Sequence, residues 1–163
     1  MGVIEIGQPA PPLALPDQNK VTVTLKELRG KRVLLSFHPL AWTGVCQRQM
    51  EALEMNADAL AGLNAVAVGI SVDSVPSKAA WADALGIEET KLLSDSWPHG
   101  AFAASLGLFR EADGFSERAS LLLDEEGIVR IVEVHPLGEA PEFDGIMEHL
   151  QALRDKTQDK EET

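Results

Sequence analysis

The chain has 163 residues, of which 45% are hydrophobic, and its formal net charge is −12. This length suits one domain with a sizeable core. The acidic balance argues against a nucleic-acid binder and against attraction to an anionic membrane. Cys46 is the only cysteine, which excludes an internal disulfide and favours a reducing, cytoplasmic location.

The first part of the chain predicts short extended segments ahead of a buried strand. Four prolines keep residues 7–16 extended, and residues 21–23 form a short β candidate. Residues 25–30 are typical of one helical turn that a glycine stops. The apolar run over residues 33–37 has the length and composition of a central strand covered on both faces.

Helices and strands alternate through the rest of the chain. Met50, Leu53, Ala57 and Leu60 recur at helical spacing, which predicts one helix that ends at Gly62. The other predicted elements are a strand over 65–72, a helix from Pro76 to Leu85, a strand over 92–94, a helix ending at Leu106, strands over 119–123 and 128–134, and a helix over 143–153.

The order of these elements predicts the fold class. Residues 124–127 form a turn, so the last two strands should pair as an antiparallel hairpin. We therefore expect an α/β protein with a mixed central sheet flanked by helices on both faces. This layout resembles a thioredoxin-like fold. One domain is expected over residues 1–155, followed by a charged, flexible tail over 156–163.

Cys46 lies where the loop after the strand at 33–37 passes into a helix. A helix N-terminus is the position that most favours a thiolate. Thr43 is either the cap of this helix or a hydroxyl donor to the sulfur or to a substrate oxygen. Pro39 would wall the site with an apolar ring. The residues alone leave two interpretations of Cys46 open, a reactive thiol and a small buried hydrophobe.

The spacing of Pro39, Thr43 and Cys46 matches the motif P-x-x-x-T-x-x-C and resembles the active site of peroxiredoxins. The segment 117–124, which contains Arg118, resembles the arginine-bearing strand of that family. Further segments carry the same likeness over about residues 4–155, among them residues 7–11 and 28–33. Two more, residues 94–100 and 107–109, most resemble the one-cysteine alkyl hydroperoxide reductase E group of the AhpC/TSA-redoxin family.

The resemblance implies a thiol-dependent peroxidase without a cofactor or a metal. The thiolate of Cys46 attacks hydrogen peroxide or an organic hydroperoxide and becomes a sulfenic acid. Arg118, the backbone N–H of Cys46 and the Thr43 hydroxyl are the expected donors to the transition state, and Pro39 shields the thiol.

The resemblance also implies partners. Since the chain has no second cysteine, an external thiol must recycle the sulfenic acid, either a low-molecular-weight thiol with a glutaredoxin-like protein or thioredoxin. A homodimer is expected as well.

Several residues near the motif depart from the family pattern. Gln49 stands where many members carry glutamate, so an electrostatic role of that glutamate is in doubt here. His38 and His99 are expected to make structural hydrogen bonds rather than act as bases. Trp42 is expected to pack beside the pocket, and Trp81 to lie in the core or in a subunit contact.

Other functions of a lone cysteine fit the sequence less well. A dithiol oxidoreductase needs C-x-x-C, but Gln49 fills the second position. A cysteine phosphatase needs C-x5-R, but Ala52 stands where the arginine belongs. A hydrolase would pair Cys46 with a histidine, and no family signature supports that pairing. The main alternative is a thioredoxin-like binding module or slow redox sensor, which peroxide kinetics would distinguish from a peroxidase.

Overall fold

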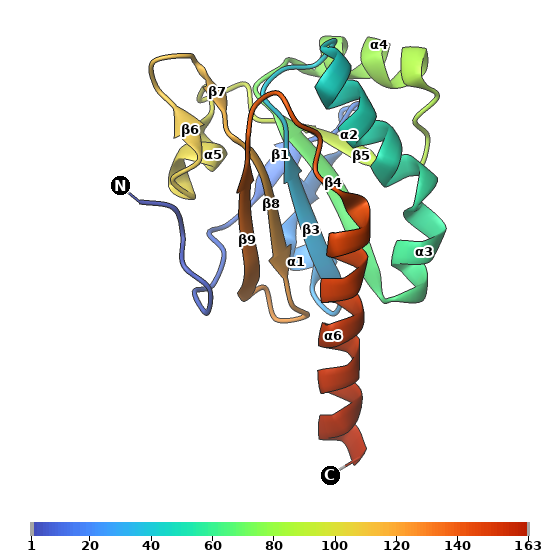
Figure 1. Ribbon diagram of the computed structural model, residues 1–163. Helices are drawn as coiled ribbons and strands as arrows, with labels where there is room; N and C mark the ends of the chain where they lie inside the picture. Colours follow the sequence, from blue (N-terminus) through green and yellow to red (C-terminus); the bar gives the residue numbers. More distant parts are fainter. Residues whose placement is uncertain (1, 163) are drawn as a thin grey trace.

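The structure is a computed structural model that describes residues 2–162, so Met1 and Thr163 lie outside the described residues. Its centre is a five-stranded sheet in the order β5-β4-β3-β8-β9 (Figure 1). The strands β3 (Arg32–Phe37), β4 (Ala65–Ser71) and β5 (Lys91–Ser94) pair in parallel. The strand β8 (Arg118–Leu123) is antiparallel to β3 and to β9 (Val129–His135). The mixed sheet and the final hairpin confirm the predicted fold class.

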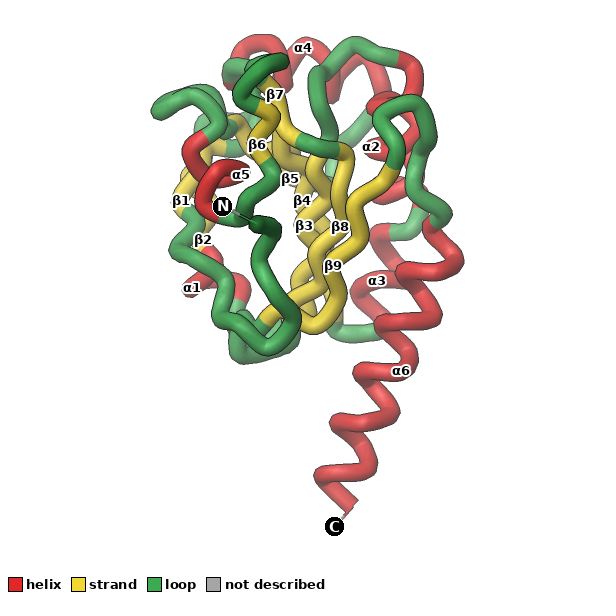
Figure 2. The backbone as a smooth tube through the Cα atoms, turned by 60° about the vertical axis from the view of Figure 1, so that its left-hand side comes forward, coloured by secondary structure: helices red, strands yellow, loops and turns green. Residues whose placement is uncertain are grey.

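Helices and short hairpins cover both faces of this sheet (Figure 2). Apolar side chains of four helices pack on one face, and one short helix, a further turn of helix and two small hairpins lie toward the other. The first group comprises α2 (Gly44–Met55), α3 (Ala57–Gly62), α4 (Val75–Leu85) and α6 (Phe143–Glu162). The second group comprises α1 (Leu25–Leu28), α5 (Ala101–Ser105), the pair β1 (Ala14–Pro16) and β2 (Thr22–Thr24), and the pair β6 (Phe109–Arg110) and β7 (Phe115–Ser116).

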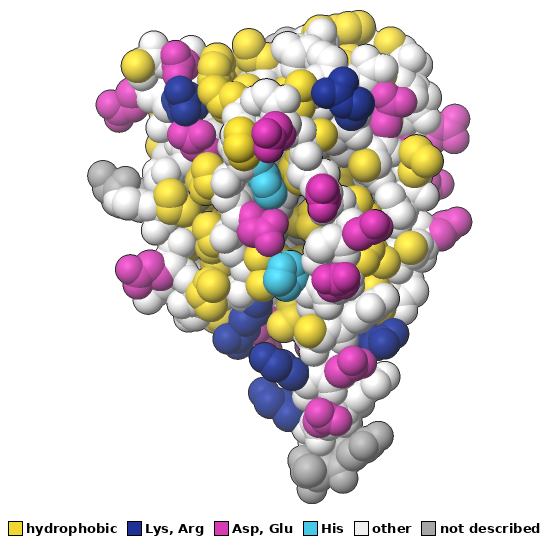
Figure 3. All heavy atoms as spheres, in the orientation of Figure 1, with side chains coloured by type: hydrophobic (Ala, Val, Ile, Leu, Met, Phe, Trp, Pro, Cys, Tyr) yellow, Lys and Arg dark blue, Asp and Glu magenta, His cyan; other side chains and the backbone are white. Residues whose placement is uncertain are grey.

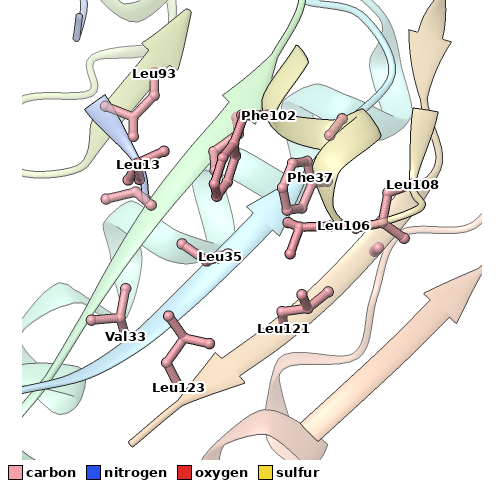
Figure 4. Close-up of a cluster of buried hydrophobic side chains, with 14 of the residues drawn as sticks. Leu13, Val33, Leu35, Phe37, Leu93, Phe102, Leu106, Leu108, Leu121 and Leu123 are labelled. Atoms are coloured by element: carbon pink, nitrogen blue, oxygen red, sulfur yellow. The ribbon is translucent and has the colours of Figure 1, made fainter. Parts of the chain in front are cut away.

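Each central strand contributes to both cores, because successive side chains of a strand point to opposite faces. Leu35 and Phe37 of β3 join the cluster that Figure 4 shows, where Phe37 stacks on Phe102 of α5 with ring centroids 6.0 Å apart. Leu34 lies between Val33 and Leu35 and points the other way. It joins the opposite cluster together with Met50 of α2. Burial of these side chains supplies the main stabilisation of the domain.

The prediction of one helix up to Gly62 is wrong, since the chain forms α2 and α3 with a break at Asn56. The Asn56 side chain donates a hydrogen bond to the Ala52 carbonyl (2.7 Å), and the backbone N–H of Asn56 contacts the same oxygen. An asparagine that competes for a helix carbonyl favours an end or a bend. The sequence analysis also did not identify β1, β6 or β7.

Residues 156–162 continue α6 as helix in the structure. The flexibility of this segment and the domain boundary at residue 155 stay predictions. Figure 3 shows acidic side chains scattered over the face with β9 and α6, and cationic side chains gathered toward the end of α6. Within residues 2–162, no helix is both long enough and apolar enough to span a lipid bilayer.

Candidate active site

The loop that carries Cys46 connects β3 to α2. The backbone N–H of His38 donates to Ile70 of β4 (3.0 Å), which continues the sheet pairing past the end of β3. Trp42 then adopts a left-handed backbone (φ +70°), and α2 begins at Gly44. Cys46 therefore lies in the first turn of α2, where backbone N–H groups have no acceptor within the helix. Its side chain is fully buried.

Arg118 reaches this sulfur from a strand far away in the sequence. It is the first residue of β8, and the antiparallel pairing of Phe37 with Ala119 brings that end of β8 beside the end of β3. The residue is 2% exposed, and its Nη1 lies 3.4 Å from Cys46 Sγ. The structure thus brings together the two residues that the sequence analysis placed at the centre of the site.

The other partners of Arg118 are neutral. Nη1 donates to Oε1 of Gln49 (2.7 Å), and Nε and Nη2 donate to the Leu137 carbonyl (3.1 and 2.8 Å). Within residues 2–162, Arg118 forms no salt bridge with a carboxylate. Gln49 in turn donates from Nε2 to Ser36 Oγ and to the Phe37 carbonyl. These bonds fix the amide so that its oxygen faces the guanidinium.

Pro39 and Thr43 border a hollow that Arg118 also lines, whereas the buried Cys46 does not line it. This shallow hollow has a volume of about 310 Å³, and Phe115 and Leu137 line it as well. The hydroxyl of Thr43 donates to the Leu40 carbonyl (3.1 Å) and does not cap α2. The first turn of α2 therefore lacks the side-chain cap that a threonine commonly supplies. Thr43 lies near Cys46 in the chain, but its hydroxyl is occupied by the loop.

Behind the loop lies a second group of buried polar side chains. His38 Nε2 and Lys78 Nζ are 3.0 Å apart, and both side chains are fully buried. Burial lowers the pKa of Lys78 to about 7, while the negative charges of Asp73 and Cys46 act in the opposite direction. Burial, and next the charge of Lys78, holds the pKa of His38 well below its ordinary value of 6.5. The ring of His38 also packs against Trp81, with centroids 5.4 Å apart.

The two tryptophans of the sequence analysis have different outcomes. Trp81 was expected in the core or in a subunit contact, and at 1% exposed it lies in the core. The expectation that Trp42 packs beside the pocket is wrong, since 57% of this residue is exposed and its indole N–H donates to Ser77 Oγ (3.1 Å). The left-handed backbone at Trp42 turns its side chain toward α4 rather than into the hollow.

Each of the four histidines contacts a group other than the Cys46 sulfur, so none forms a catalytic pair with it. His99 contacts the Gly114 carbonyl (2.7 Å), as expected of a structural histidine. His135 contacts Ser120, and His149 contacts Glu133. No histidine hydrogen-bonds Cys46 within residues 2–162, so the pair that a cysteine hydrolase needs is not formed. The same residues contain no group of three or more side chains arranged to hold a metal ion.

Sequence reasoning missed Lys78. A signal was available, because positions 78, 81, 82 and 85 of a helix lie on one face. Three of these positions hold Trp81, Ala82 and Leu85, which pack in the same cluster as Cys46. A lysine on the apolar face of a predicted helix indicates either a chain that reaches solvent or a buried functional group.

Comparisons with known proteins agree with this geometry. The model of the AhpC/TSA family matches residues 6–132, which is most of the chain. The protein "Alkyl hydroperoxide reductase E" of Mycobacterium tuberculosis is 39% identical over 138 residues, which covers 84% of this chain and 90% of that protein. "Peroxiredoxin-1" of Gallus gallus is 30% identical over 159 residues, covering 91% and 79% of the two chains.

Solved structures show the same similarity in three dimensions. The crystal structure of Enterococcus faecalis AhpC matches with a TM-score of 0.87 at 25% identity, covering 97% of this chain and 96% of that chain. Reduced 2-Cys peroxiredoxin of Plasmodium vivax matches with a TM-score of 0.84 at 28% identity, covering 95% and 84%. These matches confirm the thioredoxin-like fold and the resemblance on which the sequence analysis relied.

Proposed function

Because this chain belongs to the AhpC/TSA family of peroxiredoxins, we propose that Cys46 is the thiol with which it reduces hydroperoxides. The family activity is that of a thiol peroxidase that acts through a cysteine, and Cys46 is the only cysteine of the chain. Arg118, Thr43 and Pro39 complete the proposed site. Hydrogen peroxide and organic hydroperoxides are the proposed substrates.

The contact between Arg118 and Cys46 carries this proposal. A buried guanidinium keeps its charge at any working pH, and here its hydrogen-bond acceptors are an amide, a backbone carbonyl and the sulfur. Among its neighbours, the sulfur is the one that can provide the opposite charge by losing a proton. The thiolate is the nucleophilic form of cysteine, and the first turn of α2 adds further positive potential at the same place.

The chemical step follows from this arrangement. The thiolate attacks the terminal oxygen of ROOH, an S–O bond forms and the O–O bond breaks. Cys46 becomes a sulfenic acid, and the alkoxide that leaves takes up one proton to become ROH. Negative charge moves from sulfur to the departing oxygen during this step. Donors at both positions therefore stabilise the transition state more than the ground state, and the several coplanar N–H groups of Arg118 suit two adjacent oxygens.

Thr43 and Pro39 would act at the hollow that Arg118 also lines. The Thr43 hydroxyl hydrogen-bonds the Leu40 carbonyl, which leaves its oxygen free to accept a hydrogen bond from the peroxide O–H. The apolar ring of Pro39 has no N–H and limits the access of water. Apart from Arg118 and Thr43, the side chains that line the hollow are apolar, which favours a small hydroperoxide as substrate.

Mass spectrometry tests the proposed function directly. Equimolar hydrogen peroxide should add one oxygen atom to the intact protein, and dimedone should trap that product as an adduct on Cys46. The variant Cys46→Ser should show neither the oxygen nor the adduct, and it should consume no peroxide. Peroxide turnover by folded Cys46→Ser would rule out the mechanism, and slow oxidation of the native chain would favour the redox-sensor alternative.

We further propose that an external thiol recycles the sulfenic acid. The chain offers no second cysteine, so the reductant is either a low-molecular-weight thiol with a glutaredoxin-like protein or thioredoxin. Supplying each system separately to the oxidised protein, while peroxide consumption is followed, distinguishes them. Such reductants are maintained in a reducing compartment, which supports a location in the cytoplasm.

A homodimer is the proposed assembly. Large exposed apolar side chains favour contacts between proteins, and Trp42 and Trp97 are 57% and 86% exposed. Light scattering during size-exclusion chromatography should give twice the mass of the chain, 17.6 kDa. A monomer at working concentration would contradict this assembly without affecting the proposed chemistry.

A further inference from the structure

The loop that leads to Cys46 contains one strained residue. Trp42 carries a side chain, yet its backbone is left-handed (φ +70°). This conformation is unfavourable for any residue except glycine, and it persists only where neighbouring groups hold it. Thr43 follows directly, and α2 begins at Gly44 with Cys46 in its first turn. The turn at Trp42 therefore sets the direction in which the chain enters α2.

Two side chains from residues 73–77 hold this turn. Asp73 Oδ2 accepts a hydrogen bond from the backbone N–H of Ala41, the residue before Trp42 (2.8 Å). Ser77 Oγ, in α4, accepts from the indole N–H of Trp42 (3.1 Å). Ala41 is 6% exposed, and a buried N–H group without an acceptor is strongly unfavourable. The two bonds act on consecutive residues of the loop and together offset the strain of the left-handed turn.

The Asp73 carboxylate is itself fixed to the central sheet. The oxygen that binds Ala41 also accepts from Ser71 Oγ at the end of β4 (2.5 Å). The backbone carbonyl of Asp73 accepts from Ser94 Oγ at the end of β5 (2.5 Å). A carboxylate is a stronger acceptor than a neutral group. A continuous set of hydrogen bonds thus runs from two strands of the sheet to the loop, which is the kind of support that fixes a site precisely.

We propose that Asp73 and Ser77 are positioning residues, which hold the loop over residues 38–43 in the conformation that the peroxidase reaction needs. This inference rests on the proposed role of Cys46. Neither residue is assigned to the chemical step. Their contribution is to keep the loop from relaxing at its strained turn.

The loop carries two residues of the proposed site. Pro39 and Thr43 line one hollow together with Arg118, and among the described residues Asp73 and Ser77 do not line it. Any effect of the two positioning residues on the reaction therefore passes through the loop. If the turn relaxed, the groups that border the hollow would move relative to the guanidinium. A displacement of about 1 Å can slow a reaction about 10²-fold.

Peroxide oxidation of matched variants tests the role of Asp73. Stopped-flow rates with hydrogen peroxide should be measured for the native protein, Asp73→Ala, Asp73→Asn and the exposed control Asp83→Ala, which changes the net charge as Asp73→Ala does. Asp73→Ala should react about 10²-fold more slowly. Asp73→Asn keeps an oxygen that can accept from the Ala41 N–H, so it should restore most of the lost rate. Asp83→Ala should react at the native rate.

Hydrogen exchange separates release of the loop from general destabilisation. In Asp73→Ala, the Ala41 amide should exchange faster than in the native protein, whereas the Leu35 amide in β3 should keep its native exchange rate. Loss of global stability would accelerate both amides. A folded Asp73→Ala variant with the native oxidation rate would overturn the proposal. So would an Asp73→Asn variant as slow as Asp73→Ala, because the acceptor oxygen would then not be what matters.

Ser77→Ala is a second test that does not depend on the folding of Asp73→Ala, since alanine is well suited to a helix. It should shift the NMR signal of the Trp42 indole N–H and slow oxidation by a smaller factor than Asp73→Ala. Ser77→Thr, which keeps the hydroxyl group, should restore both. A native oxidation rate in Ser77→Ala would overturn the proposal. If the native protein itself fails to react with peroxide, the proposed function is wrong instead, which distinguishes the two failures.

Discussion

Two buried arginines stand at opposite ends of the same sheet, and they differ in what compensates their charge. Arg32 is the first residue of β3 and Arg118 is the first residue of β8, and the two strands run antiparallel. The residues are 4% and 2% exposed. Arg32 forms a salt bridge with Glu125 (2.9 Å) and donates to the Leu63 carbonyl. Arg118 has neutral acceptors and a sulfur.

We propose that this difference separates a structural cation from a functional one. Arg32 joins β3 to the turn before β9 and, through Thr157, to α6. Its charge is therefore compensated by Glu125 in contacts that hold these elements together. The charge of Arg118 has no carboxylate partner within residues 2–162, so its potential acts on whatever can ionise beside it. A buried charge without a partner destabilises the fold, and in the proposed site a Cys46 thiolate would offset that effect. The proposal thereby links fold stability to thiol reactivity at one end of the sheet.

The largest effect should follow from removing the charge of Arg118. Arg118→Met should slow the oxidation step about 10³-fold, or about 4 kcal/mol, because the transition state loses its main cationic donor. Stopped-flow oxidation of the folded variant by hydrogen peroxide measures the rate. A rate within a few-fold of the native value would show that the guanidinium is not part of the reaction.

Arg32→Met is the matched control at the other end of the sheet. It should lower the free energy of unfolding by about 2 kcal/mol, because Glu125 and the Leu63 carbonyl lose their partner while Glu125 is partly exposed to water. Its oxidation rate per folded molecule should stay native. Denaturant unfolding measures the first quantity. A large loss of rate with Arg32→Met would mean that the two arginines do not have separate roles.

Much of this arrangement can be predicted from the sequence, because its parts are local. The strand 33–37 and the Pro39-Thr43-Cys46 loop follow from short-range pattern, and the resemblance identified Arg118. The contact between Arg118 and Cys46 depends on strand register, which is decided by the whole sheet. The resemblance therefore placed Arg118 at the site, which hydrophobic periodicity alone does not do.

The environment of a residue was harder to predict where its type fits several environments. Trp42, with its left-handed backbone, lies half-exposed against α4 rather than at the pocket, and Asn56 ends a helix whose apolar spacing continues past it. Lys78 looks like an ordinary surface lysine until the helix is placed against the sheet. In each case a local conformation or a tertiary contact overrides the pattern.

Gln49→Glu should give Arg118 a carboxylate partner, as Arg32 has in Glu125. The substitution places a carboxylate where the Gln49 amide oxygen now lies, 2.7 Å from Nη1, so the guanidinium charge is compensated. The thiolate should then be less favoured, and oxidation at neutral pH should fall about tenfold, or about 1.4 kcal/mol. The loss should shrink as the pH rises. An unchanged pH profile would indicate that the thiolate depends on other donors.

The smallest expected effect is a change in the pKa of His135, which is sensitive to the charge of Arg118. It pairs directly with Arg118 across β8 and β9. Burial lowers the pKa of His135, the Glu133 carboxylate acts in the opposite direction and the Arg118 charge lowers it further. Arg118→Met should therefore move the NMR titration midpoint of His135 upward by a fraction of a pH unit. Gln49→Glu should move it in the same direction, since a compensated guanidinium repels the imidazolium less, whereas Arg32→Met should leave it in place. If Arg118→Met did not move the midpoint, the charge of Arg118 would be screened within the protein, and the distinction between the two arginines would not hold.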